Sequence, residues 1–384
     1  MGKYLQRLKE SIRKGDWILL LLCAIASAFG CLIIASATNY LDSYRYIIMQ
    51  IVGAVLGILL YTVVSSIDVD FFMERRTFLV VFNVFFLSLL IPFGETIGGN
   101  RSWVAIPGLP FNIQVAEICK LTYILIMASV MNSHKERISS PWSITHMGLH
   151  LLLMFGMSYV LSRDMGVSLI FAFIFFIMTL TGGVSLLWFA AAGGLIAVAF
   201  PIIWPMLDDY QRLRIEVLFN PSLDASGTGV LWQSNLSLRS LTGGGMTGQG
   251  LFSGHRTQND PFTGQHTDWI FSVIGEELGF VGCTFVLILL GLIIARCIWV
   301  GIRSQDYARR MICFGAAAAL IFQTIINIGM CTGVGPVIGL TLPFISYGAT
   351  SIVSLYAMLG LVSGVYARPA AISHELYIRP PTLR

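Results

Sequence analysis

The feature that most restricts the fold of this chain is a succession of long apolar runs separated by short polar segments. A helix needs about 20 consecutive apolar residues to cross the hydrocarbon core of a bilayer. Of the 384 residues, 56% are hydrophobic and only 11% are charged, whereas a soluble domain carries about 25% charged residues. The sequence therefore predicts an all-α polytopic membrane protein that has the lipid bilayer as its solvent.

Hydropathy, charges and turn residues predict about ten transmembrane helices. The predicted spans are residues 17–38, 46–66, 77–93, 113–131, 144–161, 166–182, 185–206, 269–295, 309–331 and 343–366. The first run is too long for the apolar region of a cleavable signal peptide, and no small-residue cleavage site follows it. We therefore expect it to remain as the first span.

The distribution of Lys and Arg orients these spans. A basic cluster, which includes Lys3 and Arg13, precedes the first span and predicts a cytoplasmic N-terminus. If successive spans alternate in direction from this cytoplasmic start, both termini lie in the cytoplasm. The segments that are then predicted to be cytoplasmic carry most of the Lys and Arg residues. The net charge of +4 is thus explained by topology, and no nucleic-acid partner is expected.

We expect one membrane domain, residues 1–384, with two larger extracytoplasmic loops. Its parts are a cytoplasmic N-terminus (1–16), a first large loop (94–112), a long glycine-rich loop (207–268) and a cytoplasmic tail (367–384). The chain has no Walker, Rossmann or HExxH motif, which disfavours ATP- or NAD-driven chemistry. Its seven cysteines lie in or at the ends of apolar runs without a CxxC pair.

Two charged residues lie inside the fourth predicted span. Glu117 and Lys120 are three residues apart, a spacing that places both on one face of a helix. Charged groups inside a membrane mark a functional hypothesis by default. They are either a neutralising pair with a structural role or the charged floor of a cavity that handles an anionic or polyol substrate.

The strongest constellation is the run from Gln265 to Gly279, where the long loop meets an apolar span. It begins with Gln265, His266, Thr267 and Asp268. Taken alone, Asp268 could be an N-cap, a role that aspartate fills well at the positive end of a helix. The alternative is a carboxylate presented to a substrate on the extracytoplasmic side.

Four linked motifs resemble the SEDS family (shape, elongation, division and sporulation), which includes RodA, FtsW and SpoVE. They are His266–Gly279 (HTDWIFSVIGEELG), Gly99–Lys120 (GNRSWVAIPGLPFNIQVAEICK), Arg212–Ile215 with Asn220-Pro221, and Asn327–Met330 followed by Leu342–Ser351. The resemblance covers nearly the whole chain in one order. The sequence departs from the family at Thr263–Gln265, Val115-Ala116 and Ala349, and the segment 227–258 is atypical.

The resemblance implies a RodA-like peptidoglycan glycosyltransferase, which polymerises lipid II into glycan strands at the outer face of the bacterial cytoplasmic membrane for cell elongation and shape. In that role Asp268 would be the general base for the acceptor hydroxyl. His266 would be a substrate contact, or an alternative base.

The remaining candidates would contact other parts of the substrate. Arg101, and with it Lys120 or Arg212, would bind the pyrophosphate, because cations and above all guanidinium groups match phosphate. Trp103 would pack on a sugar or the prenyl chain, or act as an interfacial anchor. Glu117 would belong to the substrate-binding cavity.

The resemblance also leaves alternatives open. A chain of this kind could be the division or sporulation paralogue with the same chemistry, or a transporter that flips lipid II. The expected partner is a class B penicillin-binding protein, the transpeptidase. No cofactor is required by the motifs, although a divalent cation, Mg²⁺ or Mn²⁺, is an open expectation.

Overall fold

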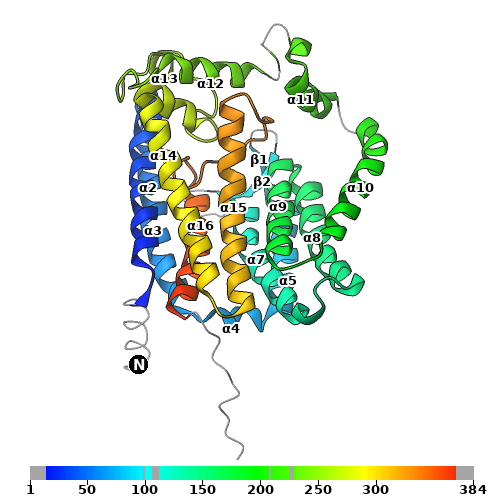
Figure 1. Ribbon diagram of the computed structural model, residues 1–384. Helices are drawn as coiled ribbons and strands as arrows, with labels where there is room; N and C mark the ends of the chain where they lie inside the picture. Colours follow the sequence, from blue (N-terminus) through cyan, green and yellow to red (C-terminus); the bar gives the residue numbers. More distant parts are fainter. Residues whose placement is uncertain are drawn as a thin grey trace, which may run out of the picture.

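A computed structural model of the protein describes residues 14–97, 100–105, 112–206, 209–224, 229 and 231–368. Figure 1 shows a bundle of long helices with a layer of short helices at one end. The predicted N-terminal segment 1–16 and tail 367–384 lie almost wholly outside the described residues.

The long helices follow the apolar runs of the sequence. They are α2 (Trp17–Ala37), α3 (Arg45–Ser66), α5 (Arg76–Ser88), α7 (Val115–Ser133), α8 (Pro141–Ser162), α9 (Met165–Thr181), α10 (Leu186–Ile203), α14 (Ile270–Arg303), α15 (Tyr307–Cys331) and α16 (Ala349–Ala367). Shorter helices are α4 (Val69–Met73), α6 (Leu90–Phe93), α11 (Asp209–Phe219), α12 (Trp232–Gly243) and α13 (His255–Asn259). Single 3-10 turns are η1 (Asn39–Leu41), η2 (Lys135–Arg137), η3 (Trp204–Met206) and η4 (Pro221–Asp224).

The prediction of an all-α polytopic membrane protein is confirmed. Eight helical stretches within the described ranges are long and apolar enough to cross a membrane, and the shorter apolar helices α9 and α10 coincide with two further predicted spans. Two boundaries differ. Helix α14 continues to Arg303 rather than ending at residue 295, and α16 begins at Ala349 rather than at residue 343. The number of ten crossings and the side on which each terminus lies stay predictions.

The two larger loops have more structure than the sequence indicated. The 94–112 loop contains an antiparallel sheet of β1 (Gly94–Ile97), β2 (Asn100–Val104) and β3 (Ile113–Gln114). The 207–268 loop contains α11, α12 and α13. Hydropathy missed these helices because they are short and polar, so neither length nor apolar periodicity distinguishes them from coil.

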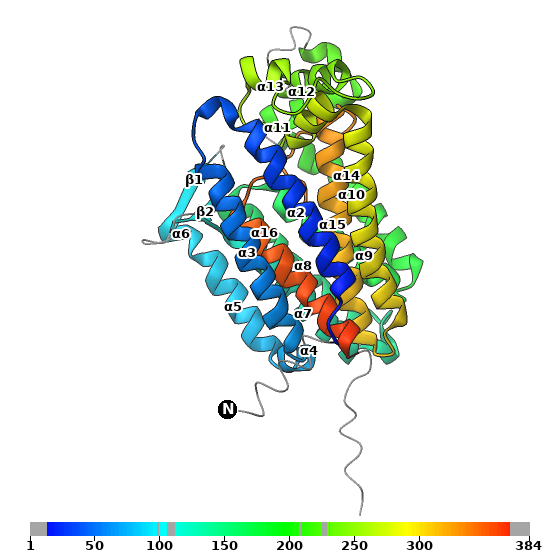
Figure 2. The same cartoon turned by 90° about the vertical axis from the view of Figure 1, so that its left-hand side faces the viewer.

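Helix α16 is the centre of the bundle. Figure 2 shows it between α2 and α3, and 89% of its apolar stretch is buried. Glycines allow the close approach of α3: a Cβ at Gly53 would overlap Ile352, and one at Gly57 would overlap Tyr356. Small residues commonly let helices meet closely in membranes, where lipid provides no hydrophobic drive for association.

A break in α14 joins this helix to the 207–268 loop. Gly279 has φ +66°, a left-handed conformation that interrupts the helix. The carbonyls of Glu276 and Glu277 accept hydrogen bonds from the N–H groups of Gln249 and Gly250, both at 2.9 Å. In the opposite direction, the N–H groups at 280 and 281 donate to the carbonyls at 245 and 246. The loop therefore satisfies the backbone groups that the break leaves open.

The side chains at the break fasten the loop as well. Glu276 is buried and accepts hydrogen bonds from the N–H of Arg256 (2.7 Å) and from the N–H and Oγ1 of Thr257 (3.1 and 2.7 Å). Glu277, also buried, accepts from Ser36 Oγ (2.6 Å) and Gln258 Nε2 (3.0 Å). Both carboxylates hold α13 against α14 and α2. Their carboxylates are therefore engaged in holding the loop.

The other end of the bundle is closed by ion pairs. Arg309 is fully buried and pairs with Asp70 at 2.7 Å and Asp68 at 3.0 Å. Asp16, at the start of α2, pairs with Arg296 at 2.9 Å. These pairs link α15 to the α3–α4 turn and α14 to α2. They lie at the end that the distribution of Lys and Arg predicts to be cytoplasmic.

Cysteine labelling in intact cells tests the predicted orientation. We expect a thiol introduced as Met246→Cys, at a side chain that is 66% exposed, to react with an impermeant maleimide from outside. Arg137→Cys, at an exposed position in η2, should react only after the membrane is opened. The unaltered chain, with its seven free cysteines, is the control. Labelling of residue 246 only from the cytoplasmic side would reverse the topology.

Candidate functional site

The residues before α14 are held by the segment that leads into α16. Three successive carbonyl groups, those of residues 266, 267 and 268, each accept a hydrogen bond. The donors are the N–H of Tyr347 (2.9 Å), Oγ of Ser346 (2.6 Å) and Nδ2 of Asn327 (2.7 Å). The main chain at Asp268 is therefore fixed without any contribution from its side chain.

Asn327 joins three parts of the site. Its Nδ2 also donates to the carbonyl of Leu340 at 2.6 Å. The neighbouring Gly339 has φ +69°, and a Cβ there would lie 3.1 Å from Oδ2 of Asp268. Segment 332–348 thus forms a wall beside this carboxylate.

Asp268 is not a helix cap. Trp269 occupies the N-cap position of α14, and no side chain caps that end. Within the described ranges the Asp268 carboxylate accepts no hydrogen bond and forms no ion pair. The half-buried side chain is therefore uncommitted to the fold, whereas structural carboxylates such as those of Glu276 and Glu277 are fully hydrogen-bonded.

Asp164 is a second acid of the site, which the sequence reasoning missed. It is buried at the N-cap of α9, where it accepts from the N–H of Val167 (3.1 Å) and from Ser102 Oγ (3.2 Å). The adjacent Gly166 packs against Ile338 of the same wall that lies beside Asp268. In the sequence Asp164 is an ordinary cap between two spans, so its proximity to Asp268 left no signal there.

Burial and mutual repulsion set the charge of these two acids. Withdrawal from water raises the pKa of Asp268 to about 6, and the charge of Asp164 adds to the rise. Burial also raises the pKa of Asp164, against the effect of its hydrogen bonds, and the nearby Glu117 raises it further. A carboxyl with a pKa of about 6 is mostly ionised at neutral pH yet binds a proton more readily than a free aspartate.

Glu117 and Lys120 form the predicted pair. Nζ of Lys120 is 2.7 Å from Oε1 of Glu117, and both side chains are about 95% buried. The other carboxylate oxygen accepts from Ser354 Oγ (3.1 Å) and Ser351 Oγ (3.4 Å) of α16. The pair therefore ties α7 to the central helix, near Asp164.

Arg101 and Trp103 lie on the outward face of β2. Ser102 and Val104 point inward, and Ser102 contacts Asp164. Arg101 is exposed and donates to the carbonyls of Gly94 (3.1 Å) and Ile91 (2.8 Å), at the end of α6. The structure thus gives Arg101 a capping role at the end of α6. It places Ser102, rather than Arg101 or Trp103, against Asp164, the second acid of the site. The contacts of Arg101 and Trp103 with a substrate stay predictions.

Arg212 lies apart from these groups. It belongs to α11, which Figure 1 shows beside α10 and outside the main bundle. Its guanidinium donates to the carbonyl of Pro205 (3.1 Å) and lies 3.7 Å from a carboxylate oxygen of Asp209. Among the described residues, no contact joins Arg212 to Asp268. The contact of Arg212 with the substrate pyrophosphate stays a prediction.

His266 belongs to an aromatic group beside Asp268. Its ring centroid is 4.8 Å from that of Tyr46 and 5.7 Å from that of Tyr347. Burial lowers the pKa of His266, so the imidazole is neutral at neutral pH. A neutral imidazole with this surrounding fits a substrate contact. Because it can also accept a proton, the role of His266 as an alternative base stays a prediction.

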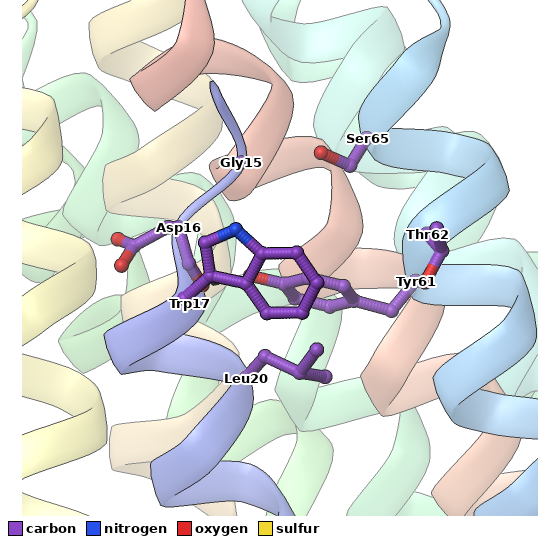
Figure 3. A pocket seen from close by; sticks show the side chains of 7 residues that line it. All are labelled: Gly15, Asp16, Trp17, Leu20, Tyr61, Thr62 and Ser65. Carbon is purple, nitrogen blue, oxygen red and sulfur yellow. Dashed lines mark hydrogen bonds between the residues drawn. The ribbon is translucent and has the colours of Figure 1, made fainter. Parts of the chain in front are cut away.

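A crevice at the other end of the bundle is not a candidate active site. It is lined by Gly15, Asp16, Trp17, Leu20, Tyr61, Thr62 and Ser65, as Figure 3 shows. Its volume of about 10 Å³ has room for one water molecule. Asp16, its only carboxylate, is already paired with Arg296.

The divalent cation that the sequence left open is not assigned. Among the residues that the structure describes, no group of three or more His, Cys, Asp or Glu side chains is placed to hold a metal ion. Mg²⁺ is often bound by only one or two carboxylates together with water and substrate phosphates. The cation therefore stays a prediction.

Comparison with known proteins places the chain in a family. The family model of the FtsW, RodA and SpoVE cell cycle proteins matches residues 16–369. The chain belongs to this family. This confirms the resemblance carried by the four motifs, and the match includes every residue of the site around Asp268.

The relatives span two named groups. The chain is 30% identical to a probable peptidoglycan glycosyltransferase FtsW of Trichlorobacter lovleyi, over 92% of this chain and 94% of that protein. It is 29% identical to the peptidoglycan glycosyltransferase MrdB of Escherichia coli, over 96% of this chain and 97% of that protein. Because these identities are so similar, they do not separate the two groups.

Solved structures share the fold. A chain from a peptidoglycan synthase complex that coordinates polymerization and crosslinking has a TM-score of 0.79 and 30% identity, covering 92% of this chain and 98% of that one. The rod shape determining protein RodA of Thermus thermophilus has a TM-score of 0.68 and 27% identity, covering 92% and 96%. The fold is therefore that of the family.

The pKa of Asp268 predicts the pH dependence of activity. If Asp268 acts as a base, kcat/KM should be constant at alkaline pH and fall about tenfold per pH unit below about 6, because protonation removes the base. Asp164→Asn should shift the midpoint to lower pH, since the charge of Asp164 raises the pKa of Asp268. Initial rates between pH 4.5 and 8.5 measure both effects. A midpoint that Asp164→Asn moves upward would contradict this electrostatic coupling.

Single changes in the Glu117–Lys120 pair should damage the protein. Each of Glu117→Gln and Lys120→Met leaves an unpaired buried charge or donor, with an expected destabilisation of about 3–5 kcal/mol. Thermal unfolding and activity of the two single variants and of the double variant measure this. If the pair is only structural, the double variant recovers stability and activity together, whereas recovered stability without activity indicates a role in the cavity.

Proposed function

We propose that this protein is a peptidoglycan glycosyltransferase that polymerises lipid II. The observation that carries the proposal is the uncommitted carboxylate of Asp268, fixed by its main chain at the end of the bundle where the long loop folds back. Family membership supports the same function, since relatives in two groups are named peptidoglycan glycosyltransferases.

The reaction requires one displacement at a sugar carbon. The acceptor hydroxyl oxygen forms a bond to the anomeric carbon of the donor, and the bond from that carbon to the pyrophosphate breaks. The electron pair leaves with the pyrophosphate, and the hydroxyl proton passes to the base. An α-linked donor then becomes a β-1,4 linkage with inversion. Asp268 is the group that accepts the proton, and its raised pKa suits that task.

Cations near this site would stabilise the leaving pyrophosphate. Among the described residues, Lys120 uses one of its three N–H donors, on Glu117, so the other two are candidates for an anionic ligand. Arg101 reaches two main-chain carbonyls through Nε and Nη2, and within the same residues Nη1 has no partner and is a candidate for phosphate. A substrate phosphate at the membrane surface would lie between α7 and the sheet that carries Arg101.

Transport of lipid II is the weaker alternative. A path across the membrane would need polar groups accessible along its whole depth. The charged groups instead gather at the two ends of the bundle, around Asp268 and Glu117 at one end and around Arg309 and Asp16 at the other. At the second end, Arg296 is paired with Asp16, and Arg309 with Asp68 and Asp70.

The setting of the reaction follows from this function. The protein would work in the bacterial cytoplasmic membrane, with its site on the outer face, together with a class B penicillin-binding protein as transpeptidase. The related peptidoglycan synthase complex that combines polymerization with crosslinking supports such a partner. The RodA-like role in elongation and the division or sporulation role share this chemistry.

Asp268→Asn tests the proposal. The substitution keeps the size of the side chain, and the side chain of Asp268 neither caps α14 nor forms a hydrogen bond within the described ranges. We therefore expect normal expression and thermal unfolding, with polymerisation of labelled lipid II reduced by about 10²–10⁴-fold, the usual effect of general-base catalysis. Gel analysis of the glycan strands, with and without the transpeptidase, is the measurement.

Asp260→Asn is the matched control. Asp260 lies in the same loop, and its side chain is 75% exposed. It should polymerise lipid II at the rate of the unaltered protein. A folded Asp268→Asn protein that makes strands at that same rate would remove Asp268 from the mechanism.

A further inference from the structure

Three aromatic side chains from distant parts of the chain meet beside Asp268. Tyr46 lies in the first turn of α3, His266 precedes α14, and Tyr347 precedes α16. Their ring centroids are separated by 4.8 Å (Tyr46 to His266), 5.1 Å (Tyr46 to Tyr347) and 5.7 Å (His266 to Tyr347). The rings are inclined to one another by 56–73°. We call these three residues the aromatic trio.

The polar side-chain atoms of the aromatic trio form no hydrogen bonds within the described part of the chain. In the part of the chain that the structure describes, the hydroxyls of Tyr46 and Tyr347 and both ring nitrogens of His266 have no hydrogen-bond partner. Of these four atoms only Nδ1 of His266 is enclosed, and all three side chains are half-buried. Tyr hydroxyls in a packed interior usually find a partner. Here the apolar parts of the rings pack together while two hydroxyls and Nε2 stay accessible.

The aromatic trio is held close to the candidate base. His266 and Asp268 are two residues apart, which limits their Cα separation to about 7 Å. The N–H of Tyr347 donates to the carbonyl of His266 at 2.9 Å, so two of the rings share one rigid piece of main chain. Burial raises the pKa of Tyr347, and the nearby positive charge of Arg45 opposes that rise. An exposed cation therefore lies next to the trio.

We propose that the aromatic trio is the subsite for the sugar ring of the acceptor. A sugar presents an apolar C–H face together with hydroxyl groups, and the trio offers ring surfaces together with two free hydroxyls and an imidazole nitrogen. Binding sites for small polar molecules commonly combine aromatic walls with a few polar groups of this kind. The proposal rests on the glycosyltransferase function proposed above and assigns the acceptor within it.

The position of the base distinguishes the acceptor from the donor. Asp268 must contact the acceptor hydroxyl, so the surface two residues away meets the same sugar. The donor pyrophosphate belongs with Lys120 on α7. This helix is linked to the first two turns of α16, where Ser351 and Ser354 donate hydrogen bonds to Glu117. The aromatic trio instead packs toward α3. Arg45 at its rim suits an acceptor that itself carries phosphate.

Kinetics of single-atom deletions test the subsite. Tyr46→Phe and Tyr347→Phe keep the rings and remove one hydroxyl each. We expect each to raise KM for lipid II by about threefold to tenfold, the effect of one lost hydrogen bond, with kcat within about twofold. His266→Phe should act in the same way and leave the pH midpoint of kcat unchanged. Rates are measured over a range of lipid II concentrations with the full chain and its transpeptidase in detergent.

Tyr44→Ala is the matched control, because Tyr44 lies on the same turn, is 80% exposed and should leave KM unchanged. Thermal unfolding of every variant shows that the fold is intact. Unchanged KM in folded Tyr46→Phe and Tyr347→Phe would overturn the subsite. So would a His266→Phe protein with an unaltered KM and a collapsed kcat, since His266 would then be the base. If the unaltered protein makes no glycan strands at all, the glycosyltransferase function itself fails.

Discussion

The site depends on one constraint, that backbone polar groups withdrawn from water must find partners within the protein. Two non-helical pieces of chain, residues 264–269 and 332–348, satisfy each other. The carbonyls at 266–268 are taken by Tyr347, Ser346 and Asn327. Gln50, which is fully buried in α3, also binds the second of these pieces. Its Nε2 donates to the carbonyl of Ser346, and its Oε1 accepts from the N–H of Gly348. Because this network consists of main chain, two side-chain amides and the hydroxyl of Ser346, the carboxylate of Asp268 is left for chemistry.

The same constraint explains the break in α14. An interrupted helix exposes two N–H and two C=O groups, and the loop residues 245–250 supply a partner for each of them. Gly248 and Gly279 meet there at a distance that admits no side chain. Glu276 and Glu277 then hold α13, whose Thr257 carbonyl accepts from Nε2 of Gln265 at 3.2 Å. The 207–268 loop is thus joined by hydrogen bonds to the residues before Asp268, so a change in the loop would reach the site through main-chain contacts.

Most of the fold could be predicted from the sequence because hydropathy and chain order suffice for membrane helices. The ten predicted spans match observed helices, with the largest errors at the ends of α14 and the start of α16. Glu117 and Lys120 were found because a helical spacing of three guarantees proximity. Asp268 was found through its motif, and its competing role as a helix cap was wrong. Asp164 was missed because its nearness to Asp268 depends on how α9 packs against residues 338–340. Ser102 was missed because its contact with Asp164 depends on how β2 lies against the start of α9.

The sequence by itself determined which segments are apolar and helical, which residues carry charge within them and to which family the chain belongs, since these are properties of local composition and order. Only the tertiary structure decided which of the candidate side chains are already engaged in hydrogen bonds or ion pairs that hold the fold together. It assigns Glu276 and Glu277 to the loop, uses two donors of Arg101 at the end of α6, and brings Tyr46 and Tyr347 to His266. The physical reason is that hydrogen bonding and burial are settled between segments hundreds of residues apart, such as Ser36 with Glu277 and Gln50 with Ser346. No local pattern encodes such pairings.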